Sequence, residues 1–150
     1  MAIHRWVPGD SEVFERNSAN AARVLDGFGL SSYVDAKTIV KQADAMYEYI
    51  TSSYGDIAEV MHEVPFAHRR NGQVVNGEID LYVMTTKGEG LLIDFKNPLL
   101  YRKAEDVDLA AKAVKYWPQM QAYCDALVAY GKPVDHIFIY YPMLGMVAKF

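Results

Sequence analysis

The sequence predicts a mixed α/β domain in which helices pack on a central sheet. Apolar residues recur with helical spacing in the N-terminal third, form short extended segments in the middle, and return to helical spacing after residue 105. The chain has 150 residues, of which 51% are hydrophobic and 13% aromatic. This is enough to build the core of one ordinary domain and is not typical of a disordered chain.

Two helices are expected in the N-terminal third of the chain. Residues 11–28 carry apolar side chains at helical spacing and end at the two glycines that flank Phe28. Residues 33–53 repeat this spacing, with a stripe of apolar residues that includes Ile39, Val40 and Ile50. Each segment therefore predicts a helix with one buried face.

Three antiparallel strands are expected next. Residues 59–68 read as a strand that contains Pro65, which places it near a sheet edge or a bulge. The Asn-Gly turn in "RRNGQ" leads to a second strand over residues 73–86. A third strand over residues 90–96 follows the turn "TKGEG".

The C-terminal part is expected to contain one more helical region and two short strands. Residues 105–130 have a helical pattern that Pro118 interrupts, so this proline should kink the helix or begin a new one. The tail "HIFIYYPMLGMVAKF" predicts two short strands around Pro142 and Gly145.

Several function classes are disfavoured by composition. The formal net charge of −4 argues against broad, charge-driven nucleic-acid binding, although it permits a local contact. A single cysteine, Cys124, cannot form an internal disulfide or a site built from several thiolates. No apolar run reaches the roughly 18 residues of a membrane span, and the N-terminus lacks a signal-peptide pattern. We therefore expect a cytoplasmic protein with no membrane partner.

Two aspartates and a lysine stand out in the middle strands. If the turn is centred near Lys87 and Gly88, Asp80 lies across from Asp94, and directly opposed residues project to the same face. Lys96 shares that face because side chains alternate along a strand. The spacing thus predicts that the two carboxylates and the ammonium group converge.

Two opposed carboxylates repel each other, and a divalent cation would relieve the repulsion. Their hard oxygens suit Mg²⁺ or Mn²⁺. A nearby lysine could orient a water molecule and offset charge on a phosphate. The pattern therefore suggests metal-dependent phosphodiester cleavage, although a surface hairpin with an ordinary Asp–Lys pair fits the spacing alone equally well.

The stretches "GEIDL" and "LLIDFK" resemble the PD-(D/E)XK nuclease superfamily, in particular the RecB/AddA-like nuclease domain of bacterial UvrD-like helicase-nucleases. The resemblance implies a restriction-endonuclease-like core, a central mixed sheet flanked by helices. It also implies that Asp80, Asp94 and the carbonyl of Phe95 bind the metal. Lys96 then completes a catalytic group with the two aspartates.

Other motifs extend this resemblance along the chain. "QMQAY" matches a family Q-x-x-x-Y helix, which makes Gln119 and Tyr123 residues that support the site. "HEVPF" resembles the family E-x-P-F strand, so Glu63 could approach the site or lie in solvent as an edge-strand carboxylate. "AIHRW" resembles the family's histidine motif, which makes His4 a metal ligand, with His62 as a weaker rival.

Taken with its family resemblance, the chain is expected to form one nuclease domain, residues 1–150, as the C-terminal fragment of a larger helicase-nuclease. The expected activity is that of an exonuclease on single-stranded DNA ends in recombination and repair, with helicase domains as partners. No Walker A motif is present, so no ATP binding is expected, and one cysteine cannot hold an iron-sulfur cluster. The candidate phosphate contacts are Arg69, Arg70, Arg102 and Lys103.

Two alternatives stay open. A non-catalytic DNA-binding or scaffold module could retain the nuclease fold without the activity. A general hydrolase has less support, because the sequence contains no Gly-x-Ser-x-Gly elbow and no His-x-x-x-His pair. Metal binding separates the first alternative from a nuclease.

Overall fold

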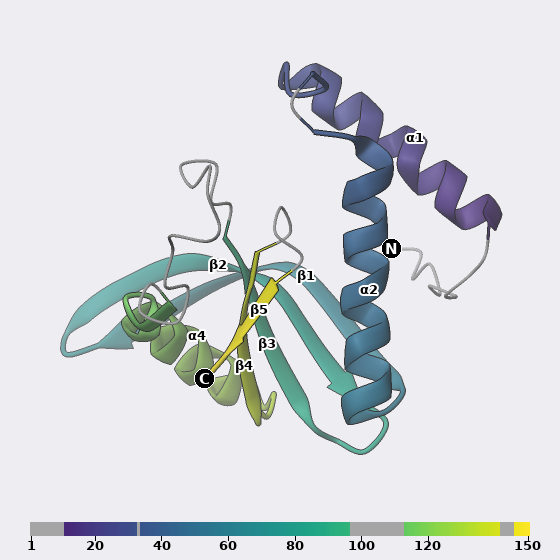
Figure 1. Ribbon diagram of the computed structural model, residues 1–150. Coiled ribbons are helices and arrows are strands. Elements are labelled where there is room, and N and C mark those ends of the chain that lie inside the picture. Colours follow the sequence, from purple (N-terminus) through teal and green to yellow (C-terminus); the bar gives the residue numbers. More distant parts are fainter. Residues whose placement is uncertain (1–10, 33, 97–112, 142–145) are drawn as a thin grey trace. The chain divides into compact units, whose positions relative to one another are not determined.

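The structure is a computed structural model that describes residues 11–32, 34–96, 113–141 and 146–150. These residues form a mixed α/β protein with three helices and a five-stranded mixed open sheet (Figure 1). The predicted fold class is confirmed at this level. The chain divides into two compact units, residues 1–50 and 51–150. No helix in the described ranges is long and apolar enough to cross a membrane.

The first unit contains α1 (Ser11–Gly27) and most of α2 (Ala36–Tyr54). Helix α1 ends in a Schellman turn, in which the amide of Leu30 donates to the carbonyl of Leu25 at 2.8 Å. Gly29 takes the left-handed conformation that this turn requires, with φ of 67°. The predicted stop at the glycines is therefore confirmed.

Helix α2 begins with a side-chain cap. Oδ2 of Asp35 accepts hydrogen bonds from the backbone amide of Thr38 at 3.0 Å and from its hydroxyl at 2.9 Å. These bonds, the hydroxyl bond first, lower the pKa of Asp35. A 3.3 Å ion pair joins Lys37 to Glu15 of α1, but both side chains are exposed and such pairs contribute little.

The sheet belongs to the second unit and has the strand order β1-β2-β3-β4-β5. Neighbouring strands are antiparallel except β3 and β4, which are parallel. The three antiparallel strands and the two tail strands predicted from the sequence are thus present. The strand bounds are β1 (Ile57–Arg70), β2 (Gln73–Thr85), β3 (Gly90–Phe95), β4 (His136–Tyr141) and β5 (Met146–Lys149).

Helix α4 (Trp117–Ala129) lies in the crossover that parallel β3 and β4 require. Pro118 occupies its first turn, where the missing amide is tolerated, so this proline begins a helix rather than kinking one. The helix packs on the sheet through a shared apolar core. Its buried members are Phe66, Ile79, Tyr82, Leu92, Ala113, Met120, Tyr123, Ala126, Leu127, Ile139 and Tyr141.

The β2–β3 hairpin has the register that the sequence predicted. The paired residues run from Met84 opposite Gly90 to Leu81 opposite Ile93. The next position of this register places residue 80 opposite residue 94. The turn between the strands contains Gly88 in the left-handed conformation, with φ of 83°.

Strands β1 and β2 continue well past the last β2–β3 pair, as the long hairpin in Figure 1 shows. Their pairing extends to Arg70 opposite Gln73. The turn at the tip is formed by Asn71 and Gly72, whose φ angles of 50° and 78° are those of a tight hairpin turn. We call residues 66–77 the hairpin arm.

The connection from α4 to β4 is fastened onto the β2–β3 hairpin. The hydroxyl of Tyr82 donates to the carbonyl of Pro133 at 2.7 Å. The amide of Gly90 donates to Oδ2 of Asp135, and the amide of Asp135 donates to the carbonyl of Gly90, both at 2.8 Å. Burial, followed by the charges of Glu59 and Asp135, raises the pKa of Tyr82 to about 12. These hydrogen bonds hold the β2–β3 hairpin, which carries Asp80 and Asp94.

Candidate active site

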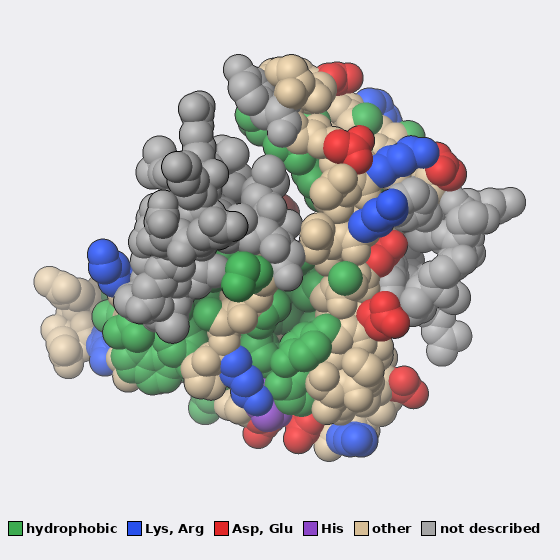
Figure 2. All heavy atoms as spheres, viewed as in Figure 1, with side chains coloured by type: hydrophobic (Ala, Val, Ile, Leu, Met, Phe, Trp, Pro, Cys, Tyr) green, Lys and Arg blue, Asp and Glu red, His purple; other side chains and the backbone are tan. Residues whose placement is uncertain are grey.

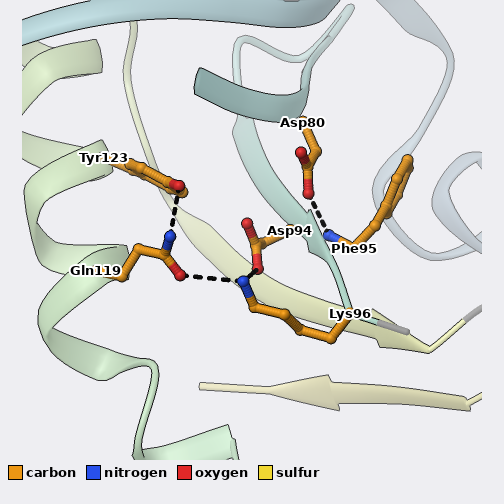
Figure 3. A network of polar contacts seen from close by, with 6 residues as sticks. All are labelled: Asp80, Asp94, Phe95, Lys96, Gln119 and Tyr123. Carbon is orange, nitrogen blue, oxygen red and sulfur yellow. Dashed lines mark hydrogen bonds and ion pairs between the residues drawn. The ribbon is translucent and has the colours of Figure 1, made fainter. Parts of the chain in front are cut away.

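The end of β3 places an acidic and a basic side chain in contact. Nζ of Lys96 lies 2.8 Å from Oδ2 of Asp94 (Figure 3). The Asp94 side chain is only 3% exposed, whereas that of Lys96 is 23% exposed. The ion pair with Lys96 therefore compensates a carboxylate that is otherwise costly to bury.

Asp80 is fixed against the same strand from β2. Its Oδ2 accepts a 2.6 Å hydrogen bond from the backbone amide of Phe95. The regular pairing of β2 with β3 ends at Leu81 and Ile93. The Asp80 carboxylate therefore accepts a hydrogen bond from a β3 amide that lies two residues beyond the last paired residue. In Figure 3 the Asp80 side chain points toward the β3 backbone, between Asp94 and the ring of Phe95.

The two carboxylates influence each other. Burial is the largest effect on Asp94 and raises its pKa, while Lys96 lowers this pKa through its hydrogen bond and charge. Asp80 raises the pKa of Asp94 further, by its charge and by a hydrogen bond. The pKa is raised overall, so the single lysine does not fully offset the burial and repulsion of the acidic pair.

Helix α4 supports Lys96 from the side opposite the hairpin. Oε1 of Gln119 accepts a 3.1 Å hydrogen bond from Nζ of Lys96, and Nε2 of Gln119 donates to the hydroxyl of Tyr123 at 2.7 Å. Figure 3 shows both helix side chains directed toward the lysine. Burial, then the charges of Asp94 and Asp80, raises the pKa of Tyr123. Its hydroxyl therefore stays neutral as the acceptor of Gln119.

Tyr116 is a site residue that the sequence reasoning missed. Nζ of Lys96 lies 4.6 Å from the centre of its ring, within cation–π range. Tyr116 precedes Gln119 by three residues, so it falls on the same helical face as Gln119 and Tyr123. This spacing of three residues before Gln119 is the sequence signal from which Tyr116 could have been identified. Lys96 is thus held by a carboxylate, an amide and an aromatic ring.

Other predicted residues do not join this group. Glu63 occupies the β1 position that the register places opposite Asp80, but its side chain is exposed and its φ is 49°. His62 pairs with Leu81 and is also exposed. Among the described residues, no group of three or more His, Cys, Asp and Glu side chains lies close enough together to hold a metal ion.

The remaining predicted residues lie away from the group or outside the described ranges. Arg69 and Arg70 are exposed at the tip of the hairpin arm. His4, Arg102 and Lys103 fall outside the described residues.

Cys124 is a poor nucleophile despite lying next to Tyr123. Burial, followed by the charge of Asp125, raises the pKa of its thiol to about 11. Little thiolate is present at neutral pH under these conditions, and the thiolate is the reactive form. The chemistry of the site thus depends on the carboxylates and the lysine.

The donor atoms suit a hard divalent cation. Asp80 and Asp94 supply carboxylate oxygens from adjacent strands, and the Phe95 carbonyl between Asp94 and Lys96 is a further oxygen of the same kind. The excess negative charge of the pair is a feature that such an ion would compensate. No protein-family model matches the chain, and no curated protein matches it.

Proposed function

We propose that this chain is a metal-dependent deoxyribonuclease domain of the PD-(D/E)XK type, with a restriction-endonuclease-like core. It hydrolyses phosphodiester bonds of single-stranded DNA as an exonuclease, in the cytoplasm, as part of a RecB/AddA-like helicase-nuclease. The observation that carries the proposal is the position of Lys96. Its ammonium group lies between Asp94 and Gln119, and the carboxylate of Asp94 also interacts with that of Asp80.

Asp80, Asp94 and the Phe95 carbonyl would hold Mg²⁺ or Mn²⁺, and His4 is proposed as a further ligand. When bound, the ion supplies a Lewis acid and lowers the pKa of a coordinated water molecule. The contacts described above use Oδ2 of each aspartate, with Phe95 and with Lys96.

Lys96 has the geometry of a group that positions water and stabilises a phosphate. An ammonium group has three donors, and here one is directed to Asp94 and one to Gln119. The third donor is the one that we assign to the attacking water or to a phosphoryl oxygen. The helix contacts hold the positive charge in place before substrate arrives, which is the condition for electrostatic stabilisation of the transition state.

Cleavage of a 5′-labelled single-stranded 20-mer tests the proposal. We expect cleavage with Mg²⁺ or Mn²⁺ and none with EDTA. Asp80→Ala and Lys96→Ala should each lower kcat by about 100-fold or more. Lys87→Ala, at the turn end of the same hairpin, is the matched control and should keep the activity. Full activity of the folded Lys96→Ala protein rules the mechanism out.

Metal binding distinguishes the nuclease from a non-catalytic module. Mn²⁺ should raise the melting temperature of the wild type, since it binds only the folded site. Asp94→Asn should abolish this rise because it removes a carboxylate that we assign to the ion. A protein that binds single-stranded DNA but shows neither Mn²⁺ stabilisation nor cleavage would be the scaffold module instead.

A further inference from the structure

The hairpin arm, residues 66–77, projects from the site end of the sheet. It lies beyond the last paired residues of β2 and β3, so it is a two-stranded ribbon with no third strand in the described sheet (Figure 1). Most of its residues are exposed, and Val74 and Val75 are 56% and 37% exposed. Isolated two-stranded hairpins are marginal in water, so the arm needs support from elsewhere.

Helix α4 supplies that support at the base of the arm. The ring of Phe66 packs edge-on against Tyr123, with 5.1 Å between centroids and an angle of 79°. Gly77, opposite Phe66, leaves room for this ring, because a Cβ there would lie 2.6 Å from it. His68 lies 3.9 Å from Asp125 of α4. The arm is thereby fixed to the helix that supports the site.

The same contacts connect the arm to the catalytic lysine. Tyr123 touches Phe66 with its ring and accepts a hydrogen bond from Gln119 with its hydroxyl. Gln119 in turn accepts the hydrogen bond from Lys96. The base of the arm and the site therefore share one continuous set of packed side chains.

The charge of the arm differs from that of the rest of the chain. It contains Arg69, Arg70 and His68 but no aspartate or glutamate, whereas the whole chain has a net charge of −4. Figure 2 shows blue side chains beside the tip of the hairpin at the left edge of the view. A local excess of positive charge on an acidic protein fits a polyanion as its ligand.

The two arginines point to opposite faces of the ribbon. Side chains alternate along a strand, so Arg70 shares a face with His68 and Phe66, which contact α4. Arg69 lies on the other face, opposite Val74. Only Arg70 is therefore on the face of the ribbon that packs against α4, the helix that supports the site.

We propose that the hairpin arm is the element that holds single-stranded DNA beyond the scissile bond, with Arg70 as its phosphate contact; this inference rests on the proposed nuclease function. The arm sets a minimum length for efficient substrates. Seven residues separate Asp80 from Gln73 at the tip, which is about 23 Å at roughly 3.3 Å per residue. At the duplex spacing of about 3.4 Å per nucleotide of one strand, this distance corresponds to about seven nucleotides, and an extended single strand spans it with fewer.

Binding of a fluorescent single-stranded 20-mer, measured by anisotropy in EDTA, tests the arm without requiring cleavage. Arg70→Gln should weaken binding by about fivefold at 0.1 M salt and reduce the salt slope by about 0.7, the effect of one lost phosphate contact on a single strand. Arg69→Gln is the matched control, with the same charge change on the other face, and should alter binding less than about twofold.

Cleavage kinetics provide the second measurement. Arg70→Gln should raise KM for the 20-mer and leave KM for a dinucleotide unchanged, because a dinucleotide is too short to reach the tip. Unchanged 20-mer binding in Arg70→Gln, or equal weakening by both variants, overturns the proposal. If the wild type binds through Arg70 but cleaves nothing, the arm stands and the nuclease function fails. If the wild type cleaves the 20-mer and Arg70→Gln changes neither binding nor KM, the nuclease function stands and the arm proposal fails.

Discussion

Gln119 holds Lys96 from α4, the helix of the crossover connection between β3 and β4, with 3.1 Å between Oε1 of Gln119 and Nζ of Lys96. The lysine follows the end of β3, and the glutamine belongs to the first turn of α4. Because Gln119 also donates to Tyr123, its side-chain orientation is fixed at both ends. The direction of the Lys96 side chain thus depends on the neutral residues Gln119 and Tyr123 as well as on Asp94.

We predict that Gln119→Met lowers the rate without lowering metal binding. The thioether has a similar length but cannot accept the bond from Lys96, so the ammonium group loses its orientation. We expect kcat to fall by about tenfold to 100-fold with KM little changed. The Mn²⁺-induced rise in melting temperature should persist. Loss of that rise, or of the fold, would assign Gln119 a structural role instead.

Tyr123→Phe offers a graded comparison. It keeps the ring that packs against Phe66 but removes the hydroxyl that accepts from Gln119. We expect a smaller loss of kcat than in Gln119→Met, because Gln119 can still contact Lys96. In the double variant the two effects should not add, since both act through one contact. Additive losses measured in kcat would show that the two residues act independently.

Gly90→Ala should destabilise the fold severely. A Cβ at this position would overlap the carbonyl of Pro133 and lie 2.6 Å from the hydroxyl of Tyr82, so backbone would have to move. We expect a loss of about 3 kcal/mol or more in the free energy of unfolding, measured by denaturant titration. Gly27→Ala is the control, because nothing lies within 4 Å of its Cβ position. Equal midpoints for the two variants would contradict this packing.

The thiol of Cys124 should react slowly in the folded protein. Its pKa of about 11, against an ordinary value of 9.0, leaves about a hundredfold less thiolate at pH 8. The rate of alkylation by iodoacetamide should rise about tenfold per pH unit up to pH 10. Urea-unfolded protein at pH 8 should react about a hundredfold faster. A fast reaction of the folded protein at pH 8 would contradict the raised pKa.

The cap at Asp35 should make the start of α2 sensitive to acid. Its pKa is lowered in the folded chain, chiefly by the Thr38 hydroxyl, so its contribution is present above the ordinary value of 3.8. That contribution is lost as the pH falls through the lower, folded pKa. The stability difference between wild type and Asp35→Ala should therefore be largest at neutral pH and disappear in strong acid. A difference that does not change with pH would exclude this cap.

Much of the site was predictable because hairpin geometry is local. Once the turn is placed near Lys87, the pairing of Asp80 with Asp94 follows from the register, and the position of Lys96 follows from alternation. A local rule also limited Pro118 to two outcomes, a kink or a helix start, and the structure has it in the first turn of α4. These features depend on residues close together in the sequence.

Contacts between distant segments were not predictable in this way. Nothing in "HIFIYY" specifies that β4 adds in parallel beside β3, because neighbour choice is decided by the whole sheet. The packing of Phe66 on Tyr123 and of Lys96 on Tyr116 likewise depends on where α4 crosses the sheet. The left-handed Glu63 also lies in a strand where alternation alone would have directed its side chain toward the aspartates.

The crossover also has a consequence for synthesis of the protein. The aspartates and the lysine leave the ribosome before α4, which packs on the sheet, and before β4, which pairs with β3. A nascent or prematurely terminated chain that ends before Gln119 would carry both carboxylates and the lysine without the helix that restrains the ammonium group. Under the proposed nuclease function, chains that end before Gln119 should therefore be inert toward cellular DNA.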